Sequence, residues 1–256
     1  MNLAGRTVLL TGATGGLGDA IARRLRAAGA ELVLTGRRVE VLEALAAETG
    51  ARSLAVDLAD AQAVERLARE CADVDVLVSN AGLPGSGLLT SFSVEQIDRA
   101  LAVNLRAPMV LARILSEAMV ARGSGHLVFM SSLAGKVGTP RSPVYSATKF
   151  GLREDLRPSG VGVSAIFPGF VRDAGMFHDT GTKLPPGVGT VSPQDVADAV
   201  VRAIERNRGE VDVAPVGLRV GTKAAGLAPD LAATVQRKLG GQRIAEDHVS
   251  AQATKR

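Results

Sequence analysis

The stretch Thr11-Gly12-Ala13-Thr14-Gly15-Gly16-Leu17-Gly18 (TGATGGLG, residues 11–18) decides the fold, because of what lies on either side of it. The apolar run TVLLTG leads into it and is typical of a buried strand, and the segment from Asp19 to Ala28 has the periodicity of a helix. Glycines allow a tight turn and let backbone N–H groups at a helix start approach a pyrophosphate. The GxxxGxG spacing is not GxGxxG, and no GK[ST] follows, which excludes a Walker loop. Between a first strand and a first helix, this turn predicts a pyrophosphate site.

The same alternation of apolar strands and helix-period segments continues along the chain. Strand-like runs are TVLLTG, ELVLTG, RSLAVD, VDVLVSN, GHLVFMSS, GVGVSAIFPG and EVDVAP; helices are expected over 19–28, 39–48 and 61–71, in a long stretch after VDVLVSN, near 143–156, and over 192–206. Strands that alternate with helices form parallel sheets buried on both faces. We predict one α/β domain with a doubly wound, Rossmann-like, mainly parallel sheet of about seven strands and helices on both faces.

Composition restricts the class of protein. The chain has 256 residues, 46% hydrophobic and 22% charged, which is enough to bury a large core and makes disorder a poor description. Its one cysteine, Cys71, cannot form an internal disulfide, and the three histidines show no zinc-type spacing, so no metal is expected. A basic leader, a signal-type run and an 18-residue apolar stretch are all lacking. We expect a soluble, cytoplasmic protein without a membrane span.

The net charge of +4 belongs to the end of the chain. Seven of the 30 Lys and Arg and three of the 26 Asp and Glu lie from Val216 onward, so the other residues carry 23 of each sign. We therefore divide the chain into a domain over 1–215 and a basic extension over 216–256. Aromatic residues are only 3% and the cations of the extension are dispersed, which favours a solvated segment over a nucleic-acid or membrane patch. Nucleic-acid binding through this extension is the weaker hypothesis, and no nucleic-acid partner is expected.

Two arginines follow the second strand, where a nucleotide ribose is expected. An Asp or Glu at this place would accept a hydrogen bond from the 2′-hydroxyl of NAD, but the sequence reads Thr35-Gly36-Arg37-Arg38. Two guanidinium groups suit a 2′-phosphate, so NADP is favoured over NAD. The alternative is a pair of ordinary surface arginines, although cations are unfavourable at the start of a helix.

The chain contains one tyrosine and no tryptophan. Tyr145 precedes Lys149 by four residues in a helical pattern, so the phenol and the ammonium share a face. A free phenol has a pKa of about 10, and a neighbouring cation lowers that pKa toward a range useful for proton transfer. The alternative is an incidental tyrosine beside a lysine with an apolar stem.

A further segment, 170–191, is rich in Gly, Pro and Thr and follows the carboxyl end of a strand, where open α/β sheets bind ligands. We expect a mobile lid; a loop without function is the alternative. Its apolar residues Phe170, Met176, Phe177 and Leu184 hint at a hydrophobic substrate.

Together these residues resemble a classical short-chain dehydrogenase/reductase over nearly all of 3–215. The matching elements are TGATGGLG, Asp57-Leu58, Asn80-Ala81-Gly82, Asn104 in VNL, Ser131-Ser132, Tyr145-Ser146-Ala147-Thr148-Lys149 and Pro168-Gly169. The interval of thirteen residues from Ser132 to Tyr145 is that of the family and selects the second serine of the pair.

The resemblance implies an NADP(H)-dependent oxidoreductase that interconverts a carbonyl and a secondary alcohol. It implies Tyr145 as the general acid/base, Ser132 as the residue that orients the substrate oxygen, Lys149 on the nicotinamide ribose, and Asn104 as the holder of a water in a proton path. The implied cofactor-binding residues are Gly12, Thr14, Gly16, Leu17, Gly18, Arg37, Arg38, Asp57, Leu58, Asn80, Tyr145, Lys149 and Val171. It also implies a homodimer or homotetramer with a small-molecule carbonyl or alcohol substrate.

The sequence departs from the family pattern at three places. Ser79 stands where a second Asn is common, and Asp173 stands where a Thr would bind the carboxamide; a carboxylate accepts hydrogen bonds but donates none. After Lys149, the pattern lacks about seven residues between Arg153 and Glu154. Either the helix is shortened by about 10 Å, or a stretch is missing from the sequence as written. Asp173 and the shortened helix support an alternative function, a non-catalytic NADP-binding scaffold or regulator.

Overall fold

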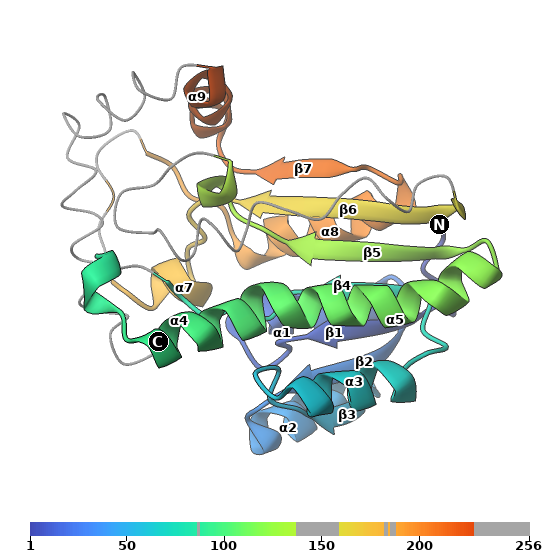
Figure 1. Cartoon of the computed structure of the whole chain (residues 1–256). Coiled ribbons are helices and arrows are strands. Elements are labelled where there is room, and N and C mark those ends of the chain that lie inside the picture. Colours follow the sequence, from blue (N-terminus) through green and yellow to red (C-terminus); the bar gives the residue numbers. More distant parts are fainter. Residues whose placement is uncertain (86–87, 137–158, 182–183, 185–187, 228–256) are drawn as a thin grey trace.

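A computed structural model of the chain describes residues 1–85, 88–136, 159–181, 184 and 188–227 (Figure 1). Within them, one parallel sheet of seven strands has the order β3-β2-β1-β4-β5-β6-β7. The strands are β1 (Thr7–Thr11), β2 (Glu31–Gly36), β3 (Arg52–Ala55), β4 (Val76–Ser79), β5 (Gly125–Met130), β6 (Val161–Pro168) and β7 (Glu210–Val213). The chain begins near the middle of the sheet and winds first to one side and then to the other. The predicted fold class is confirmed.

Helices cover both faces of this sheet. They are α1 (Gly16–Ala27), α2 (Val39–Thr49), α3 (Ala61–Glu70), α4 (Val94–Leu101), α5 (Ala107–Ala121), α7 (Gly175–His178), α8 (Pro193–Glu205) and α9 (Val216–Leu227). Helices α1 and α8 pack on one face and α3 and α5 on the other (Figure 1). None of the helices in the described ranges is long and apolar enough to cross a membrane.

The core explains why the strands are apolar throughout. Val8 and Leu10 of β1 belong to the cluster under α1 and α8, whereas Leu9 between them belongs to the cluster under α3 and α5. All three side chains are fully buried. Because successive residues of a strand point to opposite faces, a sheet covered on both faces needs apolar residues at every position.

Helix boundaries follow local capping chemistry. Ser192 forms a capping box with Asp195, and Pro193 is the first helical residue of α8, as the sequence predicts. The predicted start of the first helix at Asp19 is wrong, because α1 begins at Gly16. The glycines that form the turn also form the first turn of the helix, which sequence periodicity does not show.

The long helical stretch predicted after β4 is divided into pieces. A short 3₁₀-helix (Leu89–Ser91) precedes α4, and a π-helical turn (Ala102–Arg106) joins α4 to α5. Such turns carry one extra residue within a helix and occur often at functional sites. The helix predicted near 143–156 lies outside the described residues.

The first residues of the basic extension are not a bare solvated segment. They form α9, and its Leu218 packs beside a small buried cluster that contains Leu133, Ala165 and Phe167. In Figure 1, α9 lies at the carboxyl end of β7. Residues 228–256 lie outside the described residues.

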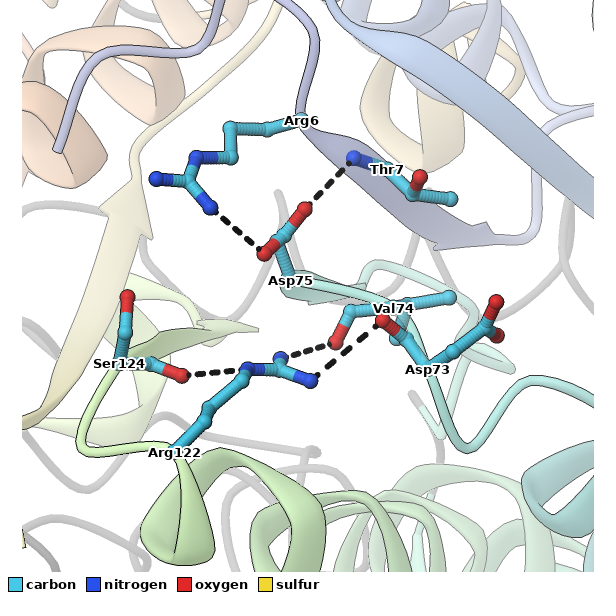
Figure 2. A network of polar contacts seen from close by, with 7 residues as sticks. All are labelled: Arg6, Thr7, Asp73, Val74, Asp75, Arg122 and Ser124. Carbon is cyan, nitrogen blue, oxygen red and sulfur yellow. Dashed lines mark hydrogen bonds and ion pairs between the residues drawn. The ribbon is translucent and has the colours of Figure 1, made fainter.

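The amino edge of the sheet is held by charged side chains (Figure 2). Asp75, just before β4, accepts from Arg6 Nη1 at 3.0 Å and from the Thr7 N–H at 3.0 Å. Arg122 at the end of α5 donates to the carbonyls of Val74 (2.6 Å) and Ser124 (2.8 Å). These contacts join the beginnings of β1, β4 and β5.

A buried histidine lies at the same edge. His126 is 2% exposed, and its Nε2 lies 2.7 Å from Ser164 Oγ, which donates to the Arg208 carbonyl at 2.7 Å. Because the hydroxyl donates to that carbonyl, it accepts the proton of Nε2. Burial, together with the charge of the amino terminus, lowers the pKa of His126 from 6.5 to about 4, so the ring is neutral at pH 7.

Candidate functional site

A cleft of about 970 Å³ opens at the carboxyl edge of the sheet, beyond the ends of β1 to β4 and beneath the segment that carries α7. Ligands of open α/β sheets bind at this edge, outside the carboxyl ends of the strands. Ten of the predicted cofactor residues line this cleft: Gly12, Thr14, Gly16, Leu17, Gly18, Arg37, Arg38, Asp57, Leu58 and Asn80.

The glycine turn forms the floor at the end of β1. Gly12 has a φ of +69°, and a Cβ there would lie 2.8 Å from Ala81 Cα. A Cβ on Gly18 would lie 2.2 Å from the Gly12 carbonyl oxygen, so only glycine lets α1 start so close to the strand. No side chain among the described residues caps this start at Gly15. The N–H groups of the first turn are therefore available to an anion, and the turn fits a pyrophosphate.

Asn80 braces this turn from the end of β4. Its Nδ2 donates to the carbonyls of Thr11 at 3.1 Å and Gly12 at 3.3 Å, and its backbone N–H donates to Thr11 Oγ1 at 3.0 Å. The Ala81 N–H donates to the same hydroxyl at 3.1 Å. The side chain of Asn80 thus holds the turn in place from below.

The two predicted arginines lie where β2 passes into α2. Arg38 donates from Nη2 to the Thr14 carbonyl of the glycine turn. Both residues are exposed, and both line the cleft. Two adjacent guanidinium groups beside a helix start give this end of the cleft the charge that a phosphate dianion needs.

Asp57 lies after β3 and has a cationic partner that the sequence analysis missed. Its Oδ1 accepts from the Ala59 N–H at 3.0 Å, and its Oδ2 accepts from Arg99 Nη2 of α4 at 3.1 Å. Although partial burial acts in the opposite direction, these hydrogen bonds and the charges of Arg99 and Arg37 lower the pKa of Asp57. Arg99 also lines the cleft. It stands 42 residues from Asp57 in the chain, so no local pattern reveals the pair.

Ser132 follows β5 and begins a tight turn. Its Oγ accepts from the Ala134 N–H at 3.2 Å, and it precedes a 3₁₀-helix (Leu133–Gly135). The side chain is half-buried. A hydroxyl that accepts from the backbone keeps its own proton for donation, which suits a contact with a substrate oxygen.

Asn104 lies in the π-helical turn, where it is 5% exposed. Its Oδ1 accepts from the Leu83 N–H at 2.7 Å, and its Nδ2 donates to the Leu83 carbonyl at 3.0 Å. The amide therefore fixes the chain that follows β4. Neither Asn104 nor Ser132 is among the residues that line the cleft.

The segment predicted to be a lid lies against the glycine turn. Its base is joined by a bridge between Val171 and Val191, and the rings of Phe170 and Phe177 are 5.0 Å apart. A Cβ on Gly16 would lie 2.6 Å from Ala174 Cβ, so the segment touches the start of α1. Val171 itself is buried and does not line the cleft.

Asp173 has a φ of +66°, in the left-handed region. Asp tolerates this conformation better than a β-branched residue does. A Thr, which is β-branched, would be strained at this φ. Its side chain is 69% exposed, beside Arg172.

The remaining predicted residues, Tyr145 and Lys149, lie outside the described residues. The structure thus gathers the predicted nucleotide-binding residues other than Val171, Tyr145 and Lys149 into one cleft. It places Ser132 at the end of the neighbouring strand β5, at the same edge of the sheet.

Known proteins resemble this chain over most of its length. Residues 6–185 match the family model described as short chain dehydrogenase. A ketoacyl reductase, HetN, of Nostoc sp. (strain PCC 7120 / SAG 25.82 / UTEX 2576) is 38% identical over 228 residues, which cover 82% of this chain and 79% of HetN.

Two solved structures share the fold as well. A putative betaketoacyl-ACP reductase is 32% identical to this chain, with a TM-score of 0.76. The match covers 85% of this chain and 99% of the reductase chain. A short-chain dehydrogenase from Sphingobium yanoikuyae in complex with NADPH is 30% identical with a TM-score of 0.75, covering 88% and 94%. With the family model matched over most of the fold, the chain belongs to the classical short-chain dehydrogenase/reductase family of oxidoreductases.

Proposed function

We propose that this protein is an NADP(H)-dependent oxidoreductase that interconverts a carbonyl and a secondary alcohol, with Tyr145 as the general acid/base. The observation that carries the proposal is the cleft, because it combines an uncapped helix start with two arginines at the end of β2. The related dehydrogenase from Sphingobium yanoikuyae was solved with NADPH, which supports the same class of cofactor.

The preference for NADP rests on charge. Arg37 and Arg38 occupy the place where an acidic residue would accept from a ribose 2′-hydroxyl. Guanidinium groups bind a phosphate by charge-assisted hydrogen bonds, whereas NAD offers them only a neutral hydroxyl. Asp57, whose carboxylate is held by Arg99 and the Ala59 N–H, would contact the adenine together with Leu58.

NADPH supplies the hydride when it is bound. Ser132 donates its hydroxyl proton in a hydrogen bond to the carbonyl oxygen and orients it. Tyr145 gives its phenol proton to the same oxygen as negative charge develops there, and removes that proton in the reverse direction. Lys149 holds the nicotinamide ribose and lowers the pKa of the phenol. Asn104, fixed by Leu83, would hold a water in the path by which the proton is replaced.

The substrate class is a hydrophobic carbonyl compound or alcohol. Phe170 and Phe177, both partly exposed, contact one another in the segment that carries α7, and Met176 of the same segment lines the cleft. Because HetN and one structural neighbour are described as ketoacyl reductases, 3-ketoacyl thioesters are the first substrates to test. We place the enzyme in the cytoplasm, as a homodimer or homotetramer.

The test is oxidation of NADPH with acetoacetyl-CoA and with a panel of aliphatic and aromatic ketones. Tyr145→Phe should lower kcat by a factor of about 10² to 10⁴, the usual contribution of a general acid, while the folded state is retained. Undiminished turnover in this variant would refute the role of Tyr145.

A phenolate titration in the near ultraviolet separates an enzyme from a scaffold without any known substrate. The chain has one Tyr and no Trp, so the signal reports Tyr145 alone. A midpoint well below about 10 that responds to NADP⁺ and not to NAD⁺ supports the enzyme. Binding of NADP⁺ with an unshifted midpoint, and no hydride transfer to any member of the panel, would favour the non-catalytic scaffold.

A further inference from the structure

The turn that carries Ser132 ends in a lysine with an unusually well-defined environment. Lys136 Nζ lies 2.6 Å from Asp212 Oδ1 and 3.2 Å from Glu210 Oε2, both on β7. The same ammonium lies 3.9 Å from the centre of the Phe167 ring on β6. The side chains of Lys136 and Asp212 are only 21% and 11% exposed. A cation held by two carboxylates and a ring, largely away from water, is more strongly fixed than an ordinary surface pair.

The rest of the turn is fastened to β6. The Ser131 N–H donates to the Ile166 carbonyl of β6 at 2.8 Å, which holds the turn at its beginning. Leu133, in the middle, packs with Ala165 and Phe167. Backbone bonds from Gly135 to Ser132 and from Lys136 to Leu133, at 2.9 and 3.0 Å, close the 3₁₀ turn. Ser132 therefore lies between two anchors, of which Lys136 is the charged one.

The two acidic side chains that hold Lys136 lie side by side on β7. Glu210 and Asp212 are two residues apart on β7 and point to the same face, and Phe167 is paired with Asp212 in the sheet register. Without a cation between them, two carboxylates on one face, one of them largely buried, would repel each other and bind water. Lys136 resolves this repulsion and joins the Ser132 turn to the sheet at the same time.

We propose that Lys136 is a positioning residue, whose contacts with Asp212, Glu210 and Phe167 hold Ser132 where it donates to the substrate oxygen. This inference rests on the proposed function, since it needs Ser132 to contact that oxygen. Small displacements of an orienting group lower the rate of the chemical step strongly. Lys136 itself does not line the nucleotide cleft, so we expect its loss to change the affinity for NADPH little.

The test compares Lys136→Met, Lys136→Arg and the double variant Lys136→Met/Asp212→Asn, in the full chain. We expect Lys136→Met to lower kcat at least tenfold while the dissociation constant of NADPH changes less than twofold. Lys136→Arg should recover most of the lost kcat, because it restores the cation. The double variant removes the repulsion between the acids, so it should fold if Lys136→Met does not, and it should still have low kcat because the anchor is missing.

The matched control is Lys223→Met, which removes an exposed lysine from α9. It should leave kcat unchanged. For each variant, we would measure NADPH oxidation with whichever compound of the panel the wild type reduces, NADPH binding, and thermal unfolding. A kcat within twofold of wild type in Lys136→Met or in the double variant overturns the inference, even where the melting temperature falls, because that result describes a purely structural ion pair. A wild-type protein that binds NADPH but reduces no substrate of the panel overturns the proposed function instead.

Discussion

Charged side chains lie at both edges of the sheet, but they do different work. At the amino edge, Asp75 and Arg122 bond the main chain where β1, β4 and β5 begin. At the carboxyl edge, backbone N–H groups of the glycine turn and the guanidinium groups of Arg37 and Arg38 line an open cleft. At the amino edge these polar groups bond the backbone of the protein, whereas the uncapped N–H groups and the two arginines at the carboxyl edge border open space. Substitutions at the amino edge should change stability, and substitutions at the carboxyl edge should change binding.

The substitution with the largest expected effect on stability and binding lies in the glycine turn, where the carboxyl edge is tightly packed. Gly18→Ala places a Cβ 2.2 Å from the Gly12 carbonyl oxygen, so the turn or the helix must move. We expect a loss of about 3 kcal/mol in the free energy of unfolding, and NADPH binding at least tenfold weaker. The control is Gly221→Ala in α9, where a Cβ meets nothing within 4 Å and alanine should add up to about 1 kcal/mol. Denaturant unfolding and NADPH titration of both variants check this, and equal behaviour of the two would contradict it.

The next effect belongs to the amino edge and depends on pH. The pKa of His126 is lowered to about 4 in the folded chain, so between pH 6.5 and 4 only the unfolded chain takes up a proton. The part of the stability that depends on His126 is therefore complete above pH 6.5, falls by about 3 kcal/mol as the pH drops toward 4, and is constant below pH 4.

His126→Gln tests this origin. Glutamine retains an N–H donor for Ser164 but does not titrate. The variant should therefore lose the part of the fall in unfolding free energy between pH 6.5 and 4 that comes from His126. Urea unfolding at a series of pH values measures it. If the unfolding free energy of the variant falls with pH as steeply as that of the wild type, other groups cause the acid sensitivity.

A smaller loss is expected for Arg122→Met, which removes the hydrogen bonds to the carbonyls of Val74 and Ser124. We expect a decrease of about 1 to 2 kcal/mol in the free energy of unfolding, with kcat per folded molecule unchanged. Arg113→Met is the control, because its exposed pair with Glu117 lies within one helix and contributes at most about 0.5 kcal/mol. A fall in kcat for Arg122→Met without loss of stability would break the division between the edges.

The smallest effect concerns Arg99 at the carboxyl edge. Its pair with Asp57 is more than a third exposed, so Arg99→Met should cost less than about 1 kcal/mol of stability. Loss of this pair leaves Asp57 less well oriented, and NADPH should bind two- to fivefold more weakly. Isothermal titration measures the change; unaltered affinity would show that Asp57 is sufficiently held by Ala59.

Several features of the fold and of the cleft were predictable from the sequence. The strands were found because they are buried on both faces and therefore apolar at every position. The glycine turn was found because its spacing lies between a strand and a helix, and Arg37 and Arg38 because they follow the second strand directly. Local rules and the order of elements were sufficient for these.

Other features depend on contacts that no local pattern contains. Arg99 meets Asp57 only because the fold brings α4 to the segment after β3, and Lys136 meets Asp212 only because β5 and β7 flank β6. The start of α1 at Gly16 contradicts the low helix propensity of glycine, and the close packing of Gly16 on Ala174 and of Gly18 on the Gly12 carbonyl overrides that propensity. The side-chain arrangement of Tyr145 and Lys149 stays a prediction.

The π-helical turn between α4 and α5 makes the length of this segment critical. The turn holds one residue more than an α-helical turn and absorbs it locally, within Ala102–Arg106. Deletion of one residue there would restore a regular α-helix and leave α4 nearly in phase with α5, so Arg99 would stay beside Asp57. The bulge that carries Asn104 would be lost, and with it the two hydrogen bonds between the Asn104 amide and the backbone of Leu83. A single deletion in this segment should therefore affect the proton path proposed for Asn104 more than the nucleotide end of the cleft.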